Sequence, residues 1–164
     1  MHRVVKAKRS LAIAAAVVAV AAGVPAMAGA SSAQTRDVPP PLTLDFTGNN
    51  DEAGAASAVG AGFGGGATVR DSNGNALGKA YDLCDKDSIA PTSVTAFCHA
   101  DIVFNSGDQI AFSVVFPIQN PLTAVYPKDF DGVITGGTGN YKGITGSVHF
   151  TNTSLAVYKL VWRD

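Results

Sequence analysis

The stretch GGTGNYKGITG, residues 136–146, gives the strongest indication of fold in this chain of 164 residues. Five of its eleven residues are glycine, and each glycine costs about 1 kcal/mol relative to alanine in a helix interior. A helix is therefore excluded here, whereas a tight or bulged strand connection needs the positive φ angles that glycine adopts freely. The β-prone segments 131–135 and 147–151 flank the stretch. The pattern predicts a structured corner in an all-β protein.

Short alternating segments, separated by turn sequences, occupy the rest of the chain. Asn73-Gly74 and residues 105–108 are typical of hairpin turns. Residues 47–66 are rich in glycine and alanine and predict a flexible loop, with Phe63 already in the strand that 67–70 continues. The proline-rich residues 117–129 predict another loop. The expected strands are 42–46, 67–70, 76–84, 94–105, 109–116, 130–135, 146–151 and 154–163, with a last turn at Asn152-Thr153. Eight short strands without a helix favour a sandwich or a barrel, and we predict an eight-stranded antiparallel β-barrel.

The N-terminus has the three parts of a secretory signal peptide. Basic residues come first, a 13-residue apolar run follows at 11–23, and small residues then offer cleavage after Ala28, Ala30 or Ala33. A transmembrane anchor is the alternative, but a spanning helix needs about 20 apolar residues. We therefore expect a signal peptide over 1–30, a flexible linker over 31–41, a barrel domain over 42–164 and secretion without a membrane span.

Charge limits the kinds of partner. Cleavage after Ala30 removes four of the 12 Lys and Arg residues and none of the 13 Asp and Glu residues, which leaves a net charge of −5. Nucleic-acid binding depends on Lys and Arg that neutralise phosphates, so this function is not expected.

Two cysteines remain in the secreted chain, Cys84 and Cys98. An even pair in an oxidising compartment predicts a disulfide. A pair of metal ligands is the alternative, although two cysteines without a matching Cys or His pair do not complete a zinc site.

Asp82 is the ionisable residue of greatest interest. It shares its strand alternation with Cys84, which should face Cys98 and the apolar side of the next strand. A carboxylate inside a barrel is costly to bury and becomes a candidate acid or base. The alternative is a solvated position near the rim.

The glycine-rich stretch, as G-G-T-G-x-Y-x-G-x-x-G, resembles the signature of allene oxide cyclases and dirigent proteins, and of small secreted bacterial proteins in the same superfamily. The resemblance covers residues 62–162. It implies an eight-stranded barrel that holds a small hydrophobic or phenolic molecule without a cofactor or a metal. Such barrels steer cyclisation, isomerisation or stereoselective coupling by restricting geometry. A non-catalytic carrier and a structural secreted protein are the alternatives.

Within such a barrel, Asp82 is the candidate catalytic residue. The candidate ligand-binding residues are Phe112, Tyr158 and Trp162 on expected inner faces and Tyr126 on the proline-rich loop. His99, Asp101 and His149 are expected to face outward, and no G-x-S-x-G nucleophile motif accompanies them. Association through the outer surface into a homo-oligomer is a further possibility.

Overall fold

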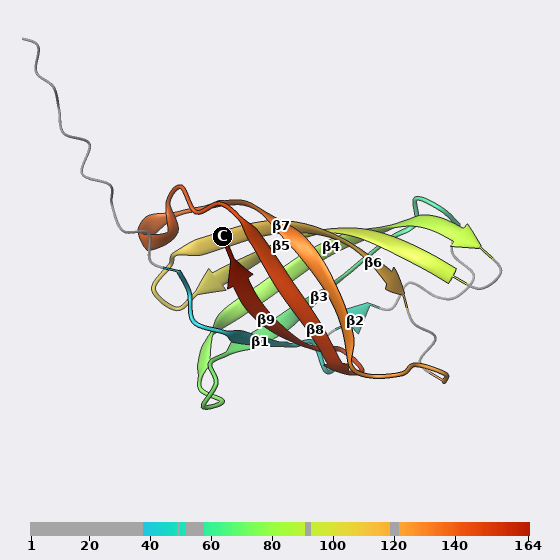
Figure 1. The fold of residues 1–164 in the computed structure, drawn as a ribbon, viewed down its shortest axis with the longest axis horizontal. Coiled ribbons are helices and arrows are strands. Elements are labelled where there is room, and N and C mark those ends of the chain that lie inside the picture. The colour runs from blue at the N-terminus through green and yellow to red at the C-terminus, as the bar shows by residue number, and fades with distance from the viewer. Residues whose placement is uncertain (1–37, 49, 52–57, 91–92, 119–121) are drawn as a thin grey trace, which may run out of the picture. The chain divides into compact units, whose positions relative to one another are not determined.

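The computed structural model describes residues 38–48, 50–51, 58–90, 93–118 and 122–164 (Figure 1). The expected signal peptide and residues 31–37 of the expected linker lie outside the described residues. In the described part of the chain, no helix is long and apolar enough to cross a membrane.

Nine strands and one 3-10 turn make up the described fold, and they confirm the prediction of an all-β antiparallel protein. Their bounds are β1 Leu42–Asp45, β2 Asn50–Asp51, β3 Gly62–Arg70, β4 Ala76–Ala90, β5 Ser93–Phe104, β6 Gln109–Ile118, β7 Lys128–Gly137, η1 Gly139–Tyr141, β8 Ser147–Ser154 and β9 Val157–Arg163. Each strand from β3 to β8 pairs with the next one along the chain. β1 pairs with both β9 and β3, which closes an eight-stranded antiparallel barrel. The short β2 pairs with β3 at Gly64 and Gly65.

Several strand ends differ from the expectation, because backbone pairing continues through sequence typical of loops. β4 does not end at Cys84 but runs to Ala90, with a bulge between Lys86 and Ser88, since its ladder with β5 continues. β4 and β5 therefore reach far to the right in Figure 1. β3 begins at Gly62, in agreement with a strand that starts near Phe63, but the short β2 lies within the expected loop. The loop expected over 117–129 is wrong at both ends, because β6 runs to Ile118 and β7 begins at Lys128.

The turn expected at Asn152-Thr153 is wrong as well. β8 continues to Ser154, and β9 begins at Val157. Asn152 is buried, and its side-chain amide donates hydrogen bonds to the carbonyls of Ser154 (2.7 Å) and Val157 (3.0 Å). The amide therefore supplies hydrogen bonds to backbone carbonyls on both sides of the hairpin turn. Ala156 adopts the positive φ that the turn requires.

Apolar side chains from all eight barrel strands fill the centre of the barrel. Alternation places them inward, as expected for strands with one buried face. The buried hydrophobic residues are Leu42, Leu44, Phe46, Ala67, Val69, Ala80, Cys84, Ala96, Cys98, Ala100, Ile102, Phe104, Ile110, Phe112, Val114, Ile134, Ile144, Val148, Phe150 and Leu160. Ring contacts link Phe112 to Phe150 (5.4 Å between centroids) and Phe150 to Phe130 (5.0 Å). The middle of the barrel is therefore packed with aromatic side chains.

The glycine-rich stretch connects β7 to β8, as predicted, and packs against one end of the barrel. The η1 turn lies at the left of Figure 1. Within the stretch Ile144 is buried, and the ring of Tyr141 lies 5.0 Å from that of Phe104. Asn140 donates a side-chain hydrogen bond to Asp108 (3.0 Å), which fastens the stretch to the β5–β6 hairpin. The corner thus also covers the end of the barrel.

Gly146 combines a positive φ with a close approach to the backbone of another strand. Its φ is +113°, and a Cβ there would collide with the carbonyl oxygen of Arg163. We expect Gly146→Ala to lower the free energy of unfolding by about 2 kcal/mol, from backbone strain together with the collision. Urea denaturation measures this loss.

Gly143→Ala is the matched control. Gly143 also has a positive φ, +77°, but nothing lies within 4 Å of the position that a Cβ would take. The free energy of unfolding of Gly143→Ala should fall by only about 1 kcal/mol, the cost of a positive φ for alanine. Equal losses for the two variants would mean that the collision at Arg163 relaxes without cost.

Candidate functional site at the Asp82 end of the barrel

Asp82 points into the barrel, as its alternation with Cys84 predicts. Its neighbours at the same parity of β4, Ala80 and Cys84, are buried, whereas Tyr81 and Leu83 between them are exposed. Asp82 itself is half-buried. The carboxyl group therefore lies inside the barrel wall with partial access to solvent.

A glycine on the neighbouring strand binds this carboxyl group through its backbone N–H. Gly65 of β3 is the register partner of Asp82, and its backbone N–H donates a hydrogen bond of 2.6 Å to Oδ1. The adjacent Gly64 also permits close approach, because a Cβ there would lie 2.6 Å from the carbonyl oxygen of Asp82. These glycines belong to the segment whose composition predicted a loop, so their contribution to the site was missed.

Burial raises the pKa of Asp82 above its ordinary value, and the hydrogen bond from Gly65 acts in the opposite direction. Burial also raises the pKa of Tyr158 to about 12, and the neighbouring Asp82 and Tyr126 add to that shift. The structure thus brings Asp82, Tyr158 and Tyr126 into one electrostatic environment.

Aromatic rings cluster around Tyr158. The ring of Tyr158 lies 5.9 Å from that of Phe46 and 6.1 Å from that of Phe130. Phe130 stacks on Phe116 at 5.1 Å. Phe130 was not singled out in the sequence, because its inward direction depends on the register of β7. The result is an aromatic cluster around the phenol group of Tyr158, on which the charge of Asp82 acts.

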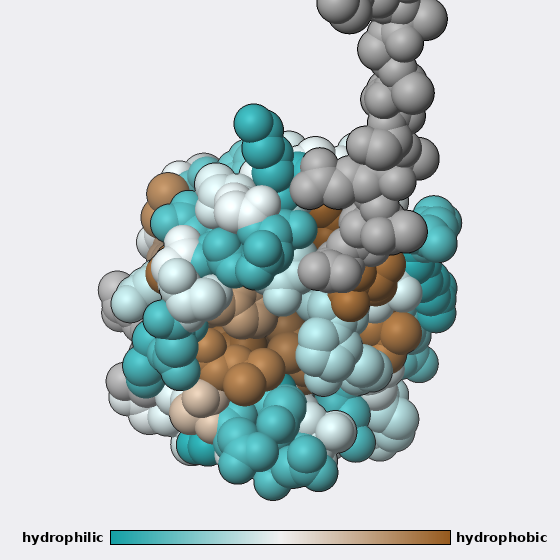
Figure 2. Space-filling model, turned by 90° about the vertical axis from the view of Figure 1, so that its left-hand side faces the viewer, coloured by the Kyte–Doolittle hydropathy of each residue, from teal (hydrophilic) through white to brown (hydrophobic). Residues whose placement is uncertain are grey.

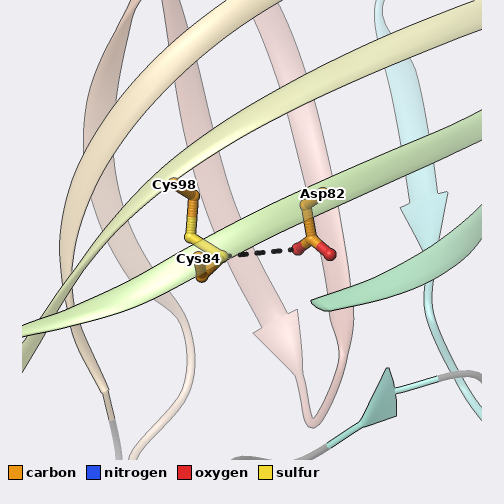
Figure 3. A group of neighbouring side chains, drawn as sticks. All are labelled: Asp82, Cys84 and Cys98. Carbon is orange, nitrogen blue, oxygen red and sulfur yellow. Dashed lines mark hydrogen bonds between the residues drawn. A yellow bond between two sulfur atoms is a disulfide. The ribbon is translucent and has the colours of Figure 1, made fainter. Parts of the chain in front are cut away.

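The predicted disulfide Cys84–Cys98 is present and lies beside Asp82 (Figure 3). The two cysteines are direct partners in the β4–β5 ladder. Sγ of Cys84 lies 3.8 Å from Oδ2 of Asp82. A disulfide sulfur carries no proton, so this approach is a contact and not a donated hydrogen bond.

Of the other two predicted ligand-binding residues, Phe112 lies two strands from Asp82, because Ala100 of β5 is the register partner of both. Phe112 is 2% exposed and belongs to the packed centre. Trp162 lies near the glycine-rich end, where its indole N–H donates to the carbonyl of Pro40 (3.1 Å).

A cleft of about 300 Å³ opens beside Trp162. Its lining comprises Val38, Ile134, Ile144, Thr145, Gly146, Trp162, Arg163 and Asp164. Figure 2 views this end of the molecule and shows apolar surface in a recess surrounded by hydrophilic residues. The cleft includes neither Asp82 nor Tyr158, so it is separate from the Asp82 site.

The histidines have partners on the outer surface. His99 Nδ1 lies 2.9 Å from Oγ of Ser113, and His149 Nδ1 lies 2.7 Å from Oδ1 of Asp131. Asp101 is exposed on the same face of β5 as His99. These groups lie outside the barrel, in agreement with the sequence.

Comparison with known proteins supports the fold. No protein-family model and no curated protein matches this chain. Among solved structures, pyocyanin demethylase is similar, with a TM-score of 0.56 over 75% of this chain and 98% of that chain. The two sequences are 19% identical, so the likeness establishes the barrel fold alone.

Proposed function

We propose that this protein is a secreted barrel of the allene-oxide-cyclase and dirigent type that binds a small hydrophobic or phenolic molecule at the Asp82 end. The proposed activity is a cofactor-free cyclisation, isomerisation or stereoselective coupling of the bound molecule. Asp82 would hold or transfer a proton, and Tyr158 would donate a hydrogen bond.

One observation carries the proposal, namely an inward, half-buried carboxyl group in a barrel that also holds a cluster of half-buried aromatic rings around Tyr158. A barrel that served only as scaffold would gain more stability from an apolar residue at Asp82, because a buried polar group costs free energy unless it is fully bonded. Ligand sites characteristically combine an apolar lining with a few convergent polar groups. Asp82 and Tyr158 match that description, and Tyr126 adds a second phenol nearby.

Two further observations support the proposal. The glycine-rich stretch resembles the signature of the cyclase and dirigent barrels, and it occupies the expected corner between late strands. The structural neighbour is named for the demethylation of pyocyanin, which is an example of small-molecule chemistry on this fold. The disulfide is compatible with secretion. Self-association stays a prediction, which light scattering after size-exclusion chromatography would measure.

Replacing Asp82 with asparagine tests the site. With 2-naphthol as an apolar phenolic probe, we expect Asp82→Asn to weaken binding about tenfold or more, because a hydrogen bond to a charged group contributes about 1.5–3 kcal/mol. The melting temperature should change little, since asparagine keeps an acceptor for the N–H of Gly65. Fluorescence titration and thermal denaturation measure the two quantities.

Asp101→Asn is the matched control, because Asp101 is an exposed carboxylate on the adjacent strand β5. It should leave 2-naphthol binding unchanged. If Asp82→Asn binds the probe as tightly as the wild type, Asp82 does not belong to a ligand site. If Asp82→Asn instead loses its folded structure, the carboxyl group is structural.

Native mass spectrometry of the protein purified from its own culture medium distinguishes an enzyme from a carrier and from a structural protein. A co-purifying apolar molecule released unchanged indicates a carrier, whereas a molecule converted on incubation with the protein indicates an enzyme. A protein that is always empty and binds no 2-naphthol indicates a structural role.

A further inference from the structure

Asp82, Cys84 and Cys98 form a group whose ability to bind a metal ion depends on the redox state of the two cysteines. Each residue offers one potential metal-ligand atom, and these atoms lie within 4.8 Å of one another. In the oxidised protein the sulfurs are joined to each other (Figure 3). Thiolates, and not disulfide sulfurs, are the metal ligands that cysteine provides.

We propose that reduction of the Cys84–Cys98 disulfide by a small dithiol converts this group into a site for a thiolate-preferring divalent cation such as Zn²⁺, held by both sulfurs and the Asp82 carboxylate. The dithiol gives up two electrons and two protons and becomes a disulfide, and Cys84 and Cys98 become thiols. Metal binding then releases the thiol protons to water. No part of this inference depends on the proposed ligand function.

The distances suit a tetrahedral ion. With Zn–S near 2.3 Å and Zn–O near 2.0 Å, the sulfur–oxygen edge of a zinc tetrahedron is about 3.5 Å and the sulfur–sulfur edge about 3.8 Å. Sγ of Cys84 and Oδ2 of Asp82 already lie 3.8 Å apart. Once the disulfide bond is broken, the sulfurs need only separate to the second of these edges.

The surrounding sheet should hold the three ligands in place after reduction. Cys84 and Cys98 are direct partners in the ladder, and their strands β4 and β5 also pair with β3 and β6 on their other sides. Backbone hydrogen bonds therefore maintain the register of the two cysteines without the disulfide.

Asp82 is oriented by a second interaction, which is typical of metal-binding carboxylates. Its Oδ1 accepts the N–H of Gly65 at 2.6 Å, and Oδ2 is the oxygen that lies against Cys84. The arrangement provides three protein ligands and leaves a fourth position for water, as in zinc sites with an open position. Two thiolates favour Zn²⁺ over the harder Mg²⁺ and Ca²⁺.

Titration with Co²⁺, a coloured substitute for Zn²⁺, tests the inference. We expect the dithiol-reduced protein, after removal of the reductant without oxygen, to bind one Co²⁺ with near-ultraviolet thiolate-to-cobalt absorption that Zn²⁺ abolishes. The oxidised protein should show no such band. Asp82→Asn should weaken Co²⁺ binding about tenfold or more, whereas Asp101→Asn should bind as the wild type does.

Melting curves keep the test decisive if reduction loosens the fold. Zn²⁺ should raise the melting temperature of the reduced wild type above its value with a chelator, and should leave Cys84→Ala/Cys98→Ala unchanged. Reduced protein that gives neither the cobalt band nor the zinc-dependent shift, whether folded or not, overturns the proposal. Wild-type affinity in Asp82→Asn overturns the assignment of the carboxylate as a ligand.

Discussion

Replacing Phe112 with alanine is expected to lower the free energy of unfolding by about 3–5 kcal/mol. Phe112 is 2% exposed, and its ring lies 5.4 Å from that of Phe150, which in turn lies 5.0 Å from that of Phe130. Truncation removes these contacts and leaves a cavity, and the closed sheet around it cannot collapse to fill the space. Urea denaturation with an unchanged m value measures the loss.

Val115→Ala is the control for Phe112→Ala. Val115 lies on the same strand but faces outward and is 53% exposed, so its truncation should change stability by no more than about 0.5 kcal/mol. A loss below about 1 kcal/mol for Phe112→Ala would contradict the packed centre, since truncating a buried phenylalanine costs several times more. It would indicate an open lumen in which Phe112 contacts a ligand, as the sequence suggested.

Removing the disulfide should have the second large effect, a loss of about 3 kcal/mol from Cys84→Ala/Cys98→Ala. The cysteines are 14 residues apart, and closing a loop of this length restricts the unfolded chain by about that amount. The melting temperature should fall by about 10 °C. Because the ladder between β4 and β5 continues on both sides of the pair, we expect the variant to fold.

Reduction of the wild type provides the control for this double variant. It breaks the same cross-link but keeps both sulfurs, so a similar fall in melting temperature without added metal assigns the effect to the cross-link. A much smaller fall on reduction would assign it instead to the packing of the two buried side chains. Far-UV circular dichroism of both samples should retain the β-sheet spectrum.

The ligand proposal and the metal proposal use the same carboxyl group in different redox states. In the oxidised protein, Asp82 lies beside an inert disulfide and its charge acts on Tyr158. In the reduced protein, its Oδ2 would join the two thiolates. Asp82→Asn is therefore the most informative single variant, since 2-naphthol reports on one state and Co²⁺ on the other.

Much of the wall of the barrel could be predicted from residues alone. Phe112 was expected on an inner face, which the structure confirms, and the parity of Asp82 with Cys84 placed the carboxyl group correctly. Strand ends were harder to predict. The charged residues after Cys84 suggested a loop, but the ladder with β5 extends β4 through them, and Asn152 suggested a turn although its amide lies inside the barrel.

The composition of the site could be predicted only in part, for a different reason. Asp82 and Tyr158 are 76 residues apart in the chain, and they meet because β1 pairs with both β9 and β3 and closes the sheet. The same strand β9 carries Trp162 towards the other end of the barrel, although Tyr158 and Trp162 share one face. Alternation gives the face of a residue but not its height along the barrel.

By itself, the sequence determined that the chain is all-β, that the glycine-rich stretch is a corner, that the cysteines pair, and that Asp82 points inward. These features depend on local conformation and on a two-residue period, both of which neighbouring residues specify. Only the tertiary structure decided that Gly65 binds Asp82, that Phe130 joins Tyr158 while Trp162 does not, and that the glycine-rich corner covers one barrel end. Those relations depend on register and closure, which are set by pairing between strands distant in the chain.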